Sequence, residues 1–136
     1  MKKHLKIESS ITSVRLVENA IDFITTEAGI NQECYGKIIV ATLEAVNNAI
    51  IHGNRYDKNK SVEIDIRLEG EALRVEVCDE GRGFRPQDVP DPTKPENIEL
   101  VNGRGVFLMT HLADEIKYND RGNCVTMKFK TSSIEY

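Results

Sequence analysis

The stretch that decides the fold is E-A-V-N-N-A-I-I-H-G, residues 44–53. Its apolar positions continue a helical period that begins after a capping residue, Asn31, and ends at Gly53, so we predict one helix across this range. The helix is apolar over much of its circumference, which is typical of a helix buried in a protein core. The polar side chains within it, Glu44 and Asn48 above all, therefore need a functional explanation.

Glu44 and Asn48 lie four residues apart, so both side chains project from the same side of the predicted helix. Ala41 and Ala45 beside them leave space for a ligand. A carboxylate and an amide oxygen at this spacing suit a magnesium site, in which Asn48 ligates the ion and Glu44 accepts a proton from an attacking hydroxyl. A side-chain pair that only reaches solvent is the alternative. We interpret the neighbouring Asn47 as structural.

A second polar cluster, D-E-G-R-G-F at residues 79–84, follows a run of alternating apolar residues that ends at Val77. A carboxylate at the end of a strand, here Asp79, can accept a hydrogen bond from the exocyclic amine of adenine. Gly81 and Gly83 would let the backbone approach a flat ring without a clash from Cβ atoms. The alternative is a strand that ends in a tight glycine bend.

A third cluster, N-G-R-G-V-F-L-M at residues 102–109, reads as a glycine-rich entry into a short helix. Backbone N–H groups at such a helix start bind anions, and Arg104 between Gly103 and Gly105 adds a charged donor, so phosphate is the expected guest. A flexible loop that meets a helix is the alternative. Neither the Walker pattern nor the Rossmann glycine pattern occurs in the sequence.

Outside these motifs, the pattern of apolar residues predicts further elements on both sides. Apolar residues recur at helical spacing up to Gly29, which is placed to end a first helix in a left-handed cap. The predicted elements are this helix at 12–28, a short strand at 5–7, strands at 62–68, 73–77, 115–118 and 124–130, and a short helix after Gly105. Strands grouped into hairpins indicate an α+β fold, a two-layer sandwich in which helices cover one face of a mixed, mostly antiparallel sheet.

The length of 136 residues leaves room for a single domain, residues 1–136. All four prolines fall in residues 85–102, where they disfavour a helix or a central strand. A loop of this length in so small a domain is usually a lid or a binding loop. We therefore predict a lid at about 85–102.

Composition limits the classes of partner and compartment. The net charge of −4 gives no general attraction for nucleic acid. The basic start lacks the apolar core of a signal peptide, and no stretch is long enough to span a membrane. We expect a cytoplasmic protein without a nucleic-acid or membrane partner. Because Cys34, Cys78 and Cys124 are odd in number and far apart, we expect buried free thiols, not a disulfide or a zinc site.

Taken in order, the three clusters resemble the N, G1 and G2 boxes of the ATP-binding fold shared by gyrase, MutL, heat-shock 90 and histidine kinases. The closest likeness is to the small stand-alone branch, the bacterial anti-sigma factor serine/threonine kinases, and it covers roughly residues 5–130. The resemblance implies Glu44 as the base and Asn48 as the magnesium ligand. It implies that the nucleotide is bound by Asp79 at the adenine amine, by Gly81 and Gly83 around the base, and by Gly103, Arg104 and Gly105 around the phosphates.

The same resemblance implies a function. The protein would use ATP and Mg²⁺ to phosphorylate a serine or threonine of an anti-anti-sigma protein, would sequester a sigma factor, and would form a homodimer. One departure concerns the late Gly-Thr pair of the family, whose Thr supports the adenine site. Here Gly122 is followed by Asn123 and Cys124.

Rival functions stay open at this level. A nucleotide-dependent binding module without kinase activity would use the same pocket. A detached histidine-kinase ATP-binding domain is disfavoured, because no dimerisation helix pair precedes the domain. A gyrase-type hydrolytic ATPase would need a transducer domain, and an α+β domain that binds no nucleotide is the last alternative.

Overall fold

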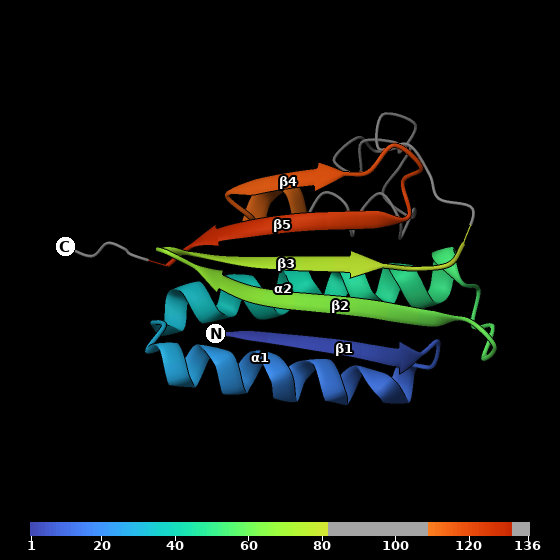
Figure 1. The fold of residues 1–136 in the computed structure, drawn as a ribbon, viewed down its shortest axis with the longest axis horizontal. Coiled ribbons are helices and arrows are strands. Elements are labelled where there is room, and N and C mark those ends of the chain that lie inside the picture. The colour runs from blue at the N-terminus through green and yellow to red at the C-terminus, as the bar shows by residue number, and fades with distance from the viewer. Residues whose placement is uncertain (82–108, 132–136) are drawn as a thin grey trace, which may run out of the picture.

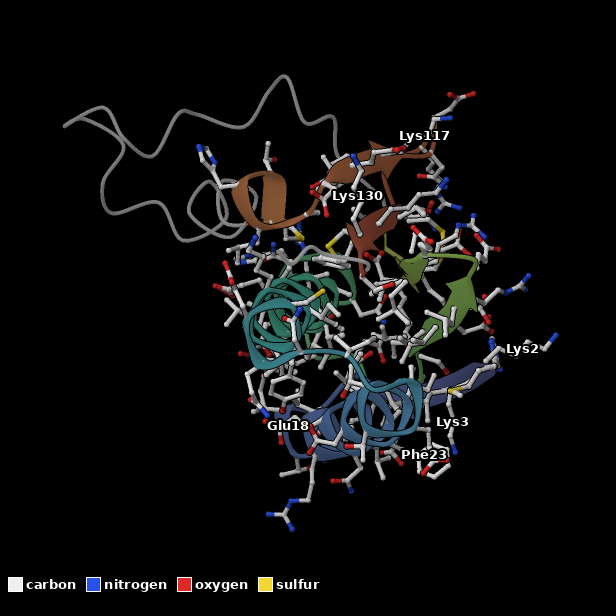
Figure 2. All side chains as sticks on the ribbon, turned by 90° about the vertical axis from the view of Figure 1, so that its left-hand side faces the viewer. Lys2, Lys3, Glu18, Phe23, Lys117 and Lys130 are labelled. Atoms are coloured by element: carbon white, nitrogen blue, oxygen red, sulfur yellow. A yellow bond between two sulfur atoms is a disulfide. The ribbon has the colours of Figure 1, made fainter. Side chains whose placement is uncertain are left out.

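The computed structural model describes residues 1–81 and 109–131. Within these ranges the chain forms a five-stranded sheet in the order β1-β2-β3-β5-β4, with every neighbouring pair antiparallel. Figures 1 and 2 show two long helices on the same side of this sheet. The predicted two-layer α+β sandwich is therefore confirmed. The elements are β1 (Lys2–Glu8), α1 (Val14–Ala28), α2 (Gln32–Asn48), β2 (Ser61–Glu69), β3 (Ala72–Cys78), β4 (Glu115–Tyr118) and β5 (Cys124–Lys130), with short turns η1 (Ile11–Ser13) and η2 (Ala49–Gly53).

The core lies between the sheet and the two helices. Alternate residues of the three central strands point toward the helices and are buried, as the two-residue period of a strand requires. They meet the apolar stripe of α1 and the broader apolar surface of α2. The buried set includes Val62, Ile64, Ile66, Leu73, Val75, Val77, Val125, Met127 and Phe129 from the sheet, and Val17, Ile21, Ile24, Ile38, Ala41, Ala45 and Val46 from the helices.

The helix ends confirm the predicted caps. Gly29 adopts the left-handed conformation at the end of α1, with φ 68°, which glycine tolerates without a Cβ penalty. The Asn31 side chain accepts a hydrogen bond from the Cys34 N–H at the start of α2. On the outer side of α1, Phe23 lies under the ammonium group of Lys3 from β1, 4.7 Å from the ring centroid (Figure 2).

The second helix ends differently from the prediction. Regular α geometry stops at Asn48, and Ala49–Gly53 form a π-helical turn. In this wider turn the N–H of Asn54 donates to the carbonyl of Ala49, five residues back, at 2.8 Å. The extra residue per turn brings Gly53 and Asn54 against the segment that follows β3, and π-turns of this kind are frequent at functional sites.

The expectation of free thiols is wrong for two of the three cysteines. Cys78 and Cys124 form a disulfide, with their Cα atoms 4.0 Å apart. They are direct cross-strand partners in the ladder between β3 and β5, and neighbouring Cα atoms approach most closely at such non-hydrogen-bonded pairs. Cys34 is a buried free thiol, as expected. Separation along the sequence does not reveal a contact that strand pairing creates.

The predicted lid at 85–102 lies outside the described residues. The helix predicted after Gly105 is seen in part, since residues 109–112 are helical. In the part of the chain that the structure describes, no helix has the length and apolar character needed to cross a membrane.

Candidate functional site

The end of η2, at Gly53, packs directly on the turn that follows β3. A Cβ atom added to Gly53 would lie closer than 3.0 Å to the carboxyl group of Asp79. A Cβ added to Gly81 would fall equally close to the backbone of Gly53. At Gly81 only glycine fits without a backbone shift, whereas a Cβ at position 53 would displace the Asp79 carboxyl group. Gly81 was predicted from the sequence as a site residue, whereas Gly53 was taken only as the end of a helix.

Asp79 is held in this junction by its neighbours. Its Oδ1 atom accepts the N–H of Gly81 at 2.8 Å. Burial raises the pKa of the Asp79 carboxyl above its ordinary value, and the Gly81 N–H together with the charges of Arg121 and Lys60 partly offset that rise. Among the described residues, no donor is hydrogen-bonded to the other carboxylate oxygen, Oδ2. This oxygen can therefore accept a hydrogen bond from a ligand amine.

The hairpin between β4 and β5 supports the same turn from the other side. The N–H of Asp79 donates to the carbonyl of Asn123 at 2.8 Å, and the Asn123 side-chain amide donates back to the Asp79 carbonyl at 2.8 Å. Arg121 donates to the carbonyl of Gly81 at 3.0 Å. Asn123 thus supports Asp79 where the resembled family has its Thr. Arg121 was not predicted, because its turn carries only a hairpin signal.

The hairpin is itself rigidly built. Oδ1 of Asn119 accepts three backbone N–H groups, those of Gly122, Asn123 and Cys124, at 2.8 to 3.1 Å. The disulfide between Cys124 and Cys78 joins this hairpin to the strand that leads into Asp79. Both connections fix the position of the Asn123 backbone under the site.

Glu44 and Asn48 lie one turn apart on α2, and both are half-buried. Neither side chain has a hydrogen-bond partner in the described part of the chain, so their oxygens are available for a ligand. Within that part, no group of three or more His, Cys, Asp or Glu side chains is arranged so that it could hold a metal ion. A metal ion here would therefore rest on an amide and a single carboxylate, plus groups of its ligand. That donor set suits Mg²⁺, which usually keeps waters and nucleotide phosphates in its shell.

A surface hollow of about 330 Å³ opens beside the glycine junction. It is lined by Gly53, Gly81 and the loop that follows η2, including Arg55 and Lys60. In that loop, Arg55 and Tyr56 both have positive φ angles, 52° and 60°, which is uncommon for residues other than glycine. The structure therefore brings two of the predicted site segments together, through Gly53 and the Asp79–Gly81 turn, beside a loop at 55–60 that was not predicted as part of the site. Gly83, Gly103, Arg104 and Gly105 lie outside the described residues and remain predictions.

The antiparallel sheet, with two helices on one face, forms an α+β sandwich (Figure 1). Residues 7–129 match the model of the histidine kinase-like ATPase domain, and the chain belongs to this family. Among curated relatives, it is 26% identical over 130 residues to a serine-protein kinase RsbW from Listeria innocua, covering 90% of this chain and 83% of the relative. It is 27% identical to the serine-protein kinase RsbW of Bacillus subtilis, covering 90% and 81%.

Two further comparisons extend this result. An anti-sigma F factor from Anoxybacillus flavithermus is 34% identical over 84 residues, which cover 59% of this chain and 56% of the relative. A crystal structure of the RsbU and RsbW domains of a Mycobacterium tuberculosis protein gives a TM-score of 0.66 at 20% identity. The match covers 95% of this chain but only 31% of that chain. The resemblance to the anti-sigma factor kinases is thus confirmed.

The glycine junction predicts a contrast between two substitutions. Gly81→Ala should lower the free energy of unfolding by about 1–3 kcal/mol, because its methyl group forces backbone apart in a packed junction. Gly36→Ala is the matched control, since Gly36 lies within α2 with no atom near its missing Cβ. It should raise stability by about 0.5–1 kcal/mol. Urea unfolding of both variants measures the difference, and a neutral Gly81→Ala would contradict the close packing.

Proposed function

We propose that this protein is an ATP-dependent serine/threonine protein kinase and anti-sigma factor, which phosphorylates an anti-anti-sigma protein and sequesters a sigma factor. The observation that carries the proposal is the Asp79 carboxylate, which is held against Gly53 and whose Oδ2 has no donor among the described residues. It stands in a chain whose relatives are named serine-protein kinases over nine-tenths of its length.

The adenine base is recognised by Asp79 in this proposal. Its Oδ2, which has no donor among the described residues, accepts a hydrogen bond from the exocyclic amine, and the close Gly53–Gly81 packing holds the carboxyl group in place. Guanine carries a carbonyl at the equivalent ring position, so the carboxylate would repel it. Gly83 is proposed to continue the base pocket. Gly103, Arg104 and Gly105 are proposed to hold the phosphates.

Asn48 and Glu44 are proposed to act in the phosphoryl transfer step. Asn48 would ligate a Mg²⁺ ion, which when bound neutralises the charge of the phosphate oxygens. Glu44 orients the hydroxyl of the acceptor and takes its proton. The hydroxyl oxygen forms a bond to the γ-phosphorus, the bond from that phosphorus to the bridging oxygen breaks, and ADP leaves.

The product of this reaction would act as a switch. Phosphorylation adds close to two negative charges to the acceptor at its interface with the kinase, which disfavours the complex by repulsion and desolvation. The kinase is then free to bind its sigma factor, in line with the relative named an anti-sigma F factor. We further propose a homodimer in the cytoplasm, on the family resemblance alone.

Incubation with γ-labelled ATP, Mg²⁺ and candidate acceptor proteins from the same cell tests the proposal. The expected result is label on a serine or threonine of one small partner, and none in the absence of Mg²⁺. A second candidate function, a binding module without chemistry, predicts nucleotide-dependent capture of a partner and no label. Absence of any ATP or ADP binding by the wild-type protein would overturn both.

A substitution at Asp79 tests the adenine assignment. Asp79→Asn presents an amide that can place a donor against the adenine amine, so it should weaken ADP binding about 10- to 150-fold, the loss of a hydrogen bond to a charged group. Binding of inorganic tripolyphosphate should stay unchanged. Asp120→Asn, the same change in the exposed hairpin turn, is the control. Calorimetric titration measures all three affinities, and unaltered ADP affinity in Asp79→Asn would refute the assignment.

The same carboxylate predicts a pH dependence. Only deprotonated Asp79 offers an acceptor on both oxygens, so ADP affinity should fall as the pH drops through its pKa in the folded protein. Because burial raises that pKa, the fall should begin at a higher pH than for an exposed Asp. Asp79→Asn should lack this dependence.

A further inference from the structure

Asn54 is the centre of a buried hydrogen-bond network next to the candidate site. The residue is 1% exposed, and both the nitrogen and the oxygen of its side-chain amide are hydrogen-bonded. Its Nδ2 atom donates to Ser9 Oγ at 2.7 Å and to the Ser61 carbonyl at 2.9 Å. Its Oδ1 atom accepts the backbone N–H of Glu80 at 2.7 Å. The network thus joins the end of η2, the end of β1, the start of β2 and the turn after β3.

The Glu80 residue is anchored a second time. Its side-chain Oε2 accepts the N–H of Ser61 at 2.6 Å, while its own N–H is held by Asn54. Glu80 lies between Asp79 and Gly81, the two residues that pack on Gly53. Its side chain is exposed and does not line the hollow beside the glycine junction. What the two anchors fix is the path of the backbone through the Asp79–Gly81 turn.

We propose that Asn54 is a positioning residue for adenine recognition, acting together with the side chain of Glu80. The pair holds the Asp79–Gly81 turn so that Oδ2 of Asp79 faces the base at one fixed place. A carboxylate that can shift would accept from adenine less well and would repel guanine less strongly. This inference rests on the proposed function, because it assumes that Asp79 binds the amine of adenine.

A purely structural role for Asn54 makes a different prediction. Loss of a buried, fully bonded amide lowers the stability of the fold in either case. A general loss of stability reduces the binding of ADP and GDP by the same factor, however, so the ratio of their affinities stays constant. A displaced Asp79 changes that ratio.

The experiment measures the dissociation constants of ADP and GDP by calorimetry for the full-length wild type and three variants. Asn54→Ala removes the acceptor of the Glu80 N–H, and we expect the preference for ADP over GDP to fall at least 10-fold. Glu80→Ala removes the second anchor from an exposed position, and we expect a fall of about three- to fivefold. Ser9→Ala is the control. It removes another buried partner of Asn54 but leaves the bond to Glu80, and it should keep the wild-type ratio within twofold.

Each outcome decides between the two proposals. A wild-type protein that binds neither nucleotide, or that does not prefer ADP, would remove the adenine site itself. A wild type that prefers ADP, with unchanged ratios in Asn54→Ala and Glu80→Ala, would overturn only the positioning role. If Asn54→Ala does not fold, Glu80→Ala alone decides. A ratio lost equally in Ser9→Ala would show that disruption anywhere in the network suffices, and it would also overturn the specific role of Asn54.

Discussion

Glu44→Gln should slow phosphoryl transfer to the acceptor protein by about 10²- to 10⁴-fold, the range that a positioned general base contributes. The amide keeps the size and shape of the side chain but cannot take the proton of the hydroxyl. Glu44 is half-buried on α2, with no hydrogen-bond partner among the described residues. The substitution therefore breaks no hydrogen bond within the described part of the chain, and ATP affinity should stay within about twofold of wild type.

Glu33→Gln provides the control for this prediction. It makes the same chemical change on the same helix, in the exposed first turn of α2. Single-turnover transfer from γ-labelled ATP, measured beside equilibrium nucleotide binding, separates the two quantities. Full transfer activity in Glu44→Gln would remove Glu44 from the mechanism. Loss of ATP binding in that variant would instead assign it to the binding site.

Reduction of the bond between Cys78 and Cys124 should lower the free energy of unfolding by about 4 kcal/mol. The two residues are 46 positions apart, and closing a loop of that length restricts the unfolded chain by this amount in the chain-entropy description. The loss is a large fraction of the stability of a domain of this size. Urea unfolding with and without a dithiol reductant measures it.

Two cysteine variants test whether the stability change comes from this disulfide. Cys124→Ala should show the lowered stability under both conditions and no response to the reductant. Cys34→Ala, at the buried free thiol, should respond to reductant as the wild type does. Mass spectrometry of the unreduced wild type should find a single intramolecular bond between Cys78 and Cys124. Free thiols at both positions would contradict the pairing.

Most of the fold could be predicted because its signals are local. The strands predicted at 115–118 and 124–130 have the bounds of β4 and β5, since exposure rises and falls with a two-residue period along most of each strand. The cap of α1 at Gly29 and the cap of α2 at Asn31 also depend on neighbouring residues alone. These features need no knowledge of which strands become partners.

The parts of the site that were missed depend on contacts between distant segments. The disulfide follows from the register of β3 against β5, which no local pattern specifies. The need for glycine at position 53 appears only when Asp79 is packed against it. Asn54 stands in a polar stretch that is typical of a loop, yet it is buried. The only sequence signal for this contact was the pair Gly53-Asn54 directly after a buried helix.

The π-turn Ala49–Gly53 also limits how the chain length can change during evolution. Each residue of an α-helix advances the chain by about 100° around the axis. Deleting one residue of this turn would restore α geometry and rotate the following backbone by that amount, swinging Gly53 away from Asp79. Insertions and deletions among homologues should therefore collect in the exposed loop at 55–60 and spare residues 49–53.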